Sequence, residues 1–110
     1  MDAHKQYMVF FSTTNSVEDA RRISEHLVKE RLVACVNIVP SITSIYWWKD
    51  RVTEDQEVLM IIKTSSRKAA EVEKAIRSLH KYETPELIGI DLMYGLPEYL
   101  KWIEASVNEK

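Results

Sequence analysis

The stretch ACVNIVPSITSIYWWKDRVTEDQEVLMIIK, residues 34–63, decides the fold of this chain. Apolar residues alternate along both halves of this stretch, and a short polar turn at residues 49–51 separates them, which is the pattern of a β-hairpin. A strand from Cys35 to Trp48 would reach about 45 Å at ~3.3 Å per residue, whereas a compact chain of this length is only on the order of 34 Å across. We therefore predict that the hairpin tip overhangs the body of the domain.

The predicted tip carries three adjacent aromatic residues, Tyr46, Trp47 and Trp48. Soluble monomers seldom leave so much apolar surface in water, and symmetric homo-oligomers commonly bury such self-complementary surfaces. We therefore expect further copies of the chain to cover the tip. The alternative is a hairpin that bends near Pro40 and folds its tip onto its own core. Proline has no amide N–H, so a bulge, kink or sheet edge is expected at Pro40 in either case.

Length and composition indicate a single domain spanning residues 1–110. A net charge of −2 gives no basic field, so we expect neither nucleic acid nor an anionic membrane as a partner. The sequence has no apolar run near the length needed to span a bilayer. Its one cysteine cannot form an internal disulfide, which is typical of a reducing compartment, so the expected location is cytoplasmic.

The remaining periodicity predicts an α+β fold. Predicted strands cover residues 6–12, 33–48, 52–64 and 87–93, and amphipathic helices cover residues 17–31, 66–79 and 97–107. The order is βαββαβ plus a C-terminal helix, which is typical of a ferredoxin-like sandwich with both crossover helices on one face. The other face would lie bare, so a partner subunit or the C-terminal helix is expected to cover it.

Local signals indicate how the helices begin. Asn15 with Glu18 three residues later resembles a capping box, and Ser65 or Ser66 can cap the second helix. Lys68 is expected on the water-facing side of that second helix.

No strong catalytic or metal-binding motif is present, since the chain has two glycines and no CxxC, HxxxH or HExxH spacing. The segment HKYETPE, residues 80–86, gathers an imidazole, a phenol and carboxylates where a helix passes into a strand. Such a junction can bind a metal or a small polar ligand. The alternative is structural, with His80 bonded to a backbone carbonyl. Cys35 is interpreted as a small buried hydrophobe, with a role as ligand or nucleophile as the alternative.

Five separated segments strongly resemble the CutA divalent-cation-tolerance family. They are VACVNIVP (33–40), ITSIYWWK (42–49), EVLMIIKT (57–64), HKYETPE (80–86) and YLKW (99–102). The resemblance covers about residues 7–104. It implies a ferredoxin-like subunit, a tight homotrimer in which the long hairpins interlock, and an architecture akin to the PII signalling proteins. It also implies a link to tolerance of copper and other divalent ions, without a settled reaction.

The resemblance further implies a cleft between subunits. Its lining would be Tyr46, Trp48, Glu57, Lys63, His80, Tyr82, Glu83 and Trp102. His80 and Cys35 are the candidate ligands for copper or another divalent cation, which is not expected to be required for folding. A second hypothesis is a PII-like signalling or scaffold adaptor trimer that binds an unidentified protein partner without metal-dependent activity. An enzyme has the weakest support, because no nucleophile and base stand at a recognisable spacing.

Two positions depart from the family pattern. Asp50 stands where the family commonly has glycine, so the turn is not expected to demand glycine, although Asp tolerates left-handed backbone better than most residues. Lys81 stands where the family often has proline, between His80 and Tyr82. We expect a looser loop there and a positive charge beside His80 that weakens copper binding.

Overall fold

The computed structural model of the chain describes residues 6–108, so residues 1–5 and 109–110 of the predicted domain lie outside the described part. In chain order the elements are β1 (Tyr7–Thr14), α1 (Val17–Lys29), β2 (Cys35–Trp48), β3 (Arg51–Ser65), the 3-10 helix η2 (Ser66–Lys68), α2 (Ala69–Leu79), β4 (Ile88–Asp91) and α3 (Pro97–Val107). None of the described helices is long and apolar enough to cross a membrane.

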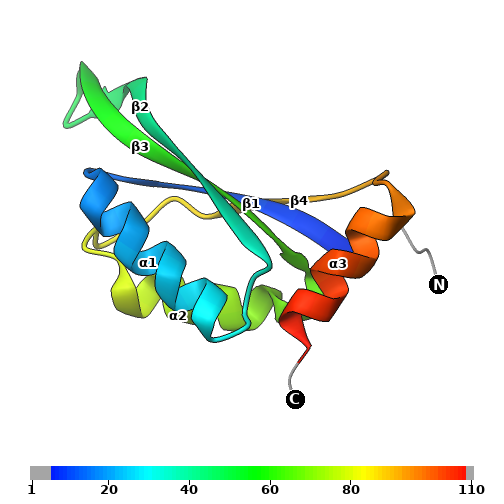
Figure 1. Cartoon of the computed structure of the whole chain (residues 1–110). Coiled ribbons are helices and arrows are strands. Elements are labelled where there is room, and N and C mark those ends of the chain that lie inside the picture. The colour runs from blue at the N-terminus through cyan, green and yellow to red at the C-terminus, as the bar shows by residue number, and fades with distance from the viewer. Residues whose placement is uncertain (1–5, 109–110) are drawn as a thin grey trace.

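The four strands form one antiparallel sheet in the order β2-β3-β1-β4. Helices α1 and α2 lie side by side on the same face of the sheet, and α3 stands at the end of the sheet far from the hairpin tip (Figure 1). This arrangement confirms the predicted α+β, ferredoxin-like fold with a C-terminal helix.

The core lies between the sheet and the two crossover helices. Its fully buried members include Ala20, Ile23 and Leu27 of α1, Val72 and Ile76 of α2, and Met60 and Ile62 of β3. Each of these side chains except the small Ala20 stabilises the fold by roughly 1.5–3 kcal/mol through burial. Because successive strand residues point to opposite faces, the inward direction of Met60 and Ile62 places Glu57 and Lys63 on the face away from α1 and α2.

Among residues 6–108, that other face is covered only at one end. There α3 contributes Ile103 and Val107 to a small cluster with Ala34. Farther along the sheet, Ile88 and Ile90 of β4 remain more than half exposed at 56% and 54%. The bare face expected from the sequence is therefore present, with the C-terminal helix covering part of it.

The β2–β3 hairpin projects well beyond the body of the domain (Figure 1). Its register runs from Cys35 opposite Lys63 to Trp48 opposite Arg51. The molecule accordingly measures 45 × 26 × 22 Å along its principal axes. Trp47 and Trp48 are 73% and 59% exposed, so the predicted overhang is confirmed and the tip does not fold back onto the core.

Two irregularities shape this hairpin. The register shifts between Val39 and Ile42, so the predicted bulge at Pro40 is confirmed. At the tip, Lys49 and Asp50 both have positive φ, 50° and 63°, between paired residues Trp48 and Arg51. Positive φ at both central residues is typical of a two-residue type I′ turn, which favours Asn and Gly. The turn therefore keeps a glycine-favouring geometry without glycine, and it is one residue shorter than predicted.

The local capping predictions need correction. Ser16, not Asn15, caps α1, because its extended backbone lets Oγ accept the amide N–H of Asp19 at 3.0 Å. Strand β1 also continues to Thr14, two residues beyond the predicted end of the first strand at residue 12. Lys68 is buried at 3% exposure, with its Nζ 3.7 Å from Glu71. It lies four residues before the buried Val72 and eight before Ile76, so helical spacing places it on their face and not on the water-facing side.

Candidate functional site

A pocket of about 950 Å³ lies at the root of the overhanging hairpin arm. Strands β2 and β3 form one wall, and the loop between α2 and β4 forms another, with the end of β1 nearby. The lining residues are Thr13, Asn15, Ser44, Ile45, Tyr46, Trp48, Asp55, Gln56, Glu57, Tyr82, Glu83, Thr84 and Glu86. The pocket therefore combines three aromatic rings with four carboxylates.

Two tyrosines in this pocket donate to carboxylates on β3. The hydroxyl of Tyr82 donates to Oε2 of Glu57 at 3.2 Å, and the hydroxyl of Tyr46 makes a short hydrogen bond to Oδ2 of Asp55. Burial, followed by the charge of Glu57, raises the pKa of Tyr82 to about 12. The hydrogen bond to Asp55 raises the pKa of Tyr46 as well. Both phenols therefore stay protonated at neutral pH.

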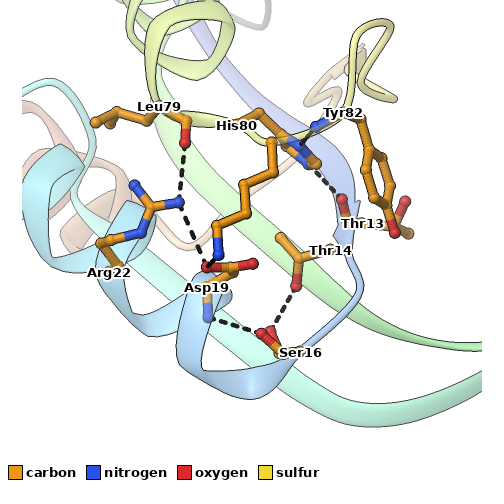
Figure 2. Close-up of polar contacts among 9 residues, drawn as sticks. Thr13, Thr14, Ser16, Asp19, Arg22, Leu79, His80 and Tyr82 are labelled. Atoms are coloured by element: carbon orange, nitrogen blue, oxygen red, sulfur yellow. Dashed lines mark hydrogen bonds and ion pairs between the residues drawn. The ribbon is translucent and has the colours of Figure 1, made fainter.

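His80 sits behind Tyr82 and connects the loop to β1 (Figure 2). Its Nε2 lies 2.6 Å from the carbonyl oxygen of Thr13, and its Nδ1 accepts the amide N–H of Tyr82 at 3.0 Å. A carbonyl only accepts and an amide N–H only donates, so this pattern requires the neutral ring with its proton on Nε2. The His80 and Tyr82 rings also lie 4.6 Å apart. His80 therefore does bond to a backbone carbonyl, and that carbonyl belongs to β1 and not to the end of a helix.

Asp19 and Arg22 of α1 together hold the end of α2 and the start of the loop (Figure 2). Its Oδ1 lies 3.3 Å from Nζ of Lys81 and 3.5 Å from the guanidinium of Arg22, which also donates to the carbonyl of Leu79 at 2.9 Å. Burial acts to raise the pKa of Asp19, but Lys81 and Arg22 outweigh it and lower that pKa. The positive charge of Lys81 is therefore paired with Asp19.

The far end of the same loop is tied to β1. Ser12, buried in that strand, donates its hydroxyl to the carbonyl of Glu86 at 2.6 Å. The loop that carries Tyr82 and Glu83 into the pocket is consequently fixed at both ends, which opposes the looseness expected from the absence of proline.

A family model described as CutA1 divalent ion tolerance protein matches residues 8–106. The chain belongs to the CutA1 family. It is 44% identical over 100 residues to the divalent-cation tolerance protein CutA of Thermus thermophilus, covering 91% of this chain and 97% of that protein. It is 47% identical over 90 residues to the CutA homolog of Xenopus laevis, covering 82% of this chain but only 60% of that longer protein.

A solved structure leads to the same family. The periplasmic divalent cation tolerance protein CutA from Archaeoglobus fulgidus aligns with a TM-score of 0.89 at 38% identity, covering 93% of this chain and 99% of that one. The family resemblance carried by the five sequence motifs is thus confirmed.

This CutA1 chain brings together part of the cleft expected from the sequence. Tyr46, Trp48, Glu57, Tyr82 and Glu83 line the pocket. His80 does not line it but holds Tyr82 from behind.

The other expected residues lie elsewhere in the CutA1 fold. Lys63 is six residues from Glu57 on β3, which corresponds to ~20 Å along a strand. Its Nζ lies 5.9 Å from the ring of Tyr99, which contacts the ring of Trp102 at 5.4 Å. Cys35 pairs with Lys63 across the strands. Lys63, Trp102 and Cys35 therefore form a second group that does not meet the pocket within one chain.

Sequence reasoning missed several functional candidates in this CutA1 chain. Asp55 lines the pocket, and its position two residues before Glu57 on the same strand could have identified it. Asp19, which supports the loop, was missed as well, whereas the pocket residue Glu86 belongs to the segment 80–86 that the sequence singled out. No local pattern predicts the partnership of Asp19 with Lys81, because only the tertiary fold brings α1 and the loop together.

Proposed function

We propose that the chain forms a homotrimer whose subunit-interface cleft binds a divalent cation or a small polar ligand, and that this binding underlies a role in divalent-ion tolerance. The observation that carries the proposal is the pocket in which Glu57, Tyr82 and Glu83 meet Tyr46 and Trp48 at the root of the hairpin. The name of the family, divalent ion tolerance protein, supports the cation as ligand.

The exposed apolar surface supports the trimer. Trp47 on the overhanging tip is largely exposed, as is Val52 opposite it, and Ile88 and Ile90 leave one face of the sheet open. Neighbouring copies would bury both surfaces. Sedimentation equilibrium at micromolar concentration should give the mass of three chains. A single-chain mass would contradict the trimer.

The trimer also gives a role to the second group of residues. Lys63, Cys35 and Trp102 lie too far along the sheet to join the pocket of their own chain, so a neighbouring copy would have to supply them to the cleft. Trimers made only of Glu57→Gln chains, or only of Lys63→Met chains, should bind the ligand poorly. Mixing the two variants tests the shared cleft, because some clefts of a mixed trimer would combine a native Glu57 from one chain with a native Lys63 from its neighbour. Recovery of ligand binding in the mixture supports a shared site, and no recovery contradicts it.

Copper is the first cation to test, with His80 and Cys35 as the candidate ligands. Both nitrogens of His80 already make hydrogen bonds, so coordination would replace one of them. Titration calorimetry with Cu²⁺ should show weaker binding in His80→Ala, in Cys35→Ser, or in both. Unchanged affinity in both variants would remove these residues as ligands.

We propose that the function is binding and not catalysis. We propose the cytosol as the location, because a single cysteine is typical of a reducing compartment. A relative from Archaeoglobus is described as periplasmic, so fractionation of the native cell is the direct test of location.

A PII-like adaptor is the second candidate. It is supported by the exposed side chains of Met93, Tyr94 and Leu96 ahead of α3, which a partner protein could cover. Partner capture that is unaffected by metals favours the adaptor.

A further inference from the structure

The pocket at the root of the hairpin is strongly acidic. Asp55 and Glu57 lie on its β3 wall, and Glu83 and Glu86 lie on its loop wall. Among the described residues that line it within one chain there is no Lys, Arg or His. A Lys63 supplied by a neighbouring copy would still leave four carboxylates against one ammonium group. The nearest loop cation, Lys81, is paired with Asp19 on α1. The charge of the pocket is therefore suited to a cationic ligand.

The charged and phenolic groups of the pocket are available as hydrogen-bond acceptors, whereas five neutral lining side chains also carry donors: Thr13, Asn15, Ser44, Gln56 and Thr84. Ionised carboxylates only accept, and Tyr46 and Tyr82 already donate their hydroxyl protons to Asp55 and Glu57. The remaining lone pairs of the phenol and carboxylate oxygens are left for donors of a ligand. The raised pKa of Tyr82, to which both Glu57 and Asp55 contribute, is consistent with this negative environment.

The four carboxylates are spread over two walls. Asp55 and Glu57 are separated by ~6.6 Å along an extended strand, and the other two belong to the opposite loop. Within residues 6–108, no three His, Cys, Asp or Glu side chains converge in a way that could hold a metal ion. A volume of about 950 Å³ is also large for a bare ion and lies within the range of organic-ligand pockets.

The aromatic rings supply a second kind of contact. Tyr46, Trp48 and Tyr82 line the same pocket as the carboxylates. The faces of such rings attract ammonium groups and pack against aliphatic carbon chains. A pocket that combines rings with carboxylates therefore fits a ligand in which several ammonium groups are separated by methylene groups.

We propose that this pocket binds an aliphatic polyamine, with the carboxylates of the two walls accepting hydrogen bonds from separate ammonium groups and the aromatic rings packing on the methylene chain. The inference rests on the proposed cleft and specifies the class of its small polar ligand.

The test is titration calorimetry on the full chain at neutral pH, with spermidine, 1,4-diaminobutane and the uncharged analogue 1,4-butanediol as probes. Spermidine should bind most tightly, the diamine more weakly, and the diol should give no measurable binding. Glu57→Gln and Glu83→Gln should each weaken spermidine binding by about tenfold, as expected for loss of one charge-assisted hydrogen bond.

Glu73→Gln is the matched control, because it removes one carboxylate from the exposed face of α2 away from the pocket. Equal weakening by Glu73→Gln, or spermidine binding no tighter than that of the diol, would overturn the proposal. Glu83 is exposed, so its variant tests the site even if Glu57→Gln perturbs folding.

Sedimentation and Cu²⁺ titration in the same buffer distinguish failure of the polyamine proposal from failure of the proposed function. A trimer that binds Cu²⁺ in the cleft but not spermidine overturns only the ligand class. A single-copy species that binds neither probe overturns the ligand class and the proposed function together.

Discussion

The amide of Tyr82 donates to Nδ1 of His80 at 3.0 Å, while the hydroxyl of the same tyrosine reaches Glu57. His80 is in turn bonded to the carbonyl of Thr13 in β1. The orientation of a pocket side chain is thus set by a histidine outside the pocket, which is anchored to the sheet.

Replacing His80 tests this anchoring. His80→Ala removes the bond to Thr13 and leaves the amide of Tyr82 without its acceptor, so we expect the free energy of unfolding to fall by about 1–3 kcal/mol. His80→Asn retains an acceptor near the position of Nδ1 and should lose less. Denaturant unfolding at one fixed protein concentration measures both variants. An alanine variant as stable as the native chain would contradict the prediction.

The titration of Tyr82 provides a direct probe of the pocket. Its pKa is raised to about 12, with Glu57 as a cause, so Glu57→Gln should lower this pKa towards 10. Alkaline difference absorbance of tyrosinate, with Tyr82→Phe identifying the signal, measures the shift. An unchanged pKa in Glu57→Gln would indicate that burial alone raises it.

The same shift predicts the direction of alkaline stability. Between pH 10 and 12 the unfolded chain loses the Tyr82 proton while the folded chain keeps it, so stability contributed by this group is present below pH 10 and falls as the pH rises towards 12. Tyr82→Phe should show a shallower decline of melting temperature over this interval. Parallel declines in both proteins would count against it.

Asp19 is expected to control acid stability. Its pKa is lowered from 3.8, so its contribution is present above that pH and is lost as the pH falls through the lower folded-state value. Asp19→Asn should be less stable than the native chain near pH 7, and the difference should narrow below pH 4. Thermal melting across this range measures the effect, and a pH-independent difference would show that the carboxylate charge does not matter.

The hairpin turn offers a stabilising substitution. Asp50 has φ of 63°, a left-handed conformation that costs non-glycine residues roughly 1–2 kcal/mol. Asp50→Gly should therefore raise the free energy of unfolding, but by less than about 1 kcal/mol, because Asp tolerates this conformation better than most residues and glycine adds flexibility to the unfolded chain. Asp50→Ala is the control, because alanine also has a Cβ and keeps the cost of the left-handed conformation. A glycine variant no more stable than the alanine variant would refute the explanation.

The sequence predicted features that depend on local periodicity. Alternation along residues 34–63 revealed the hairpin, and the missing N–H of Pro40 revealed the bulge. Capping was harder, because Asn15 and Ser16 are adjacent residues that can both cap a helix, and only the backbone conformation distinguishes them.

The site was predictable only in part. Glu57 and Tyr82 were identified through motifs, whereas the bond from His80 to Thr13 joins residues 67 positions apart. No local pattern specifies such a contact. The separation of Lys63 from the pocket likewise depends on strand geometry, since a motif gives the identity of residues but not the distance between them.

The register shift beside Pro40 also decides which aromatic side chains accompany Glu57. Before the shift, odd-numbered residues of β2 are paired with odd-numbered residues of β3, as in Val39 with Leu59; beyond it, Tyr46 is paired with Thr53. The one extra residue in β2 therefore reverses which of its residues, odd-numbered or even-numbered, lie opposite the odd-numbered residues of β3 in the outer arm. If β2 instead paired residue for residue with β3 and made no bulge, Ile45 would lie opposite Thr53, and an aliphatic chain would replace the phenol that now bonds Asp55.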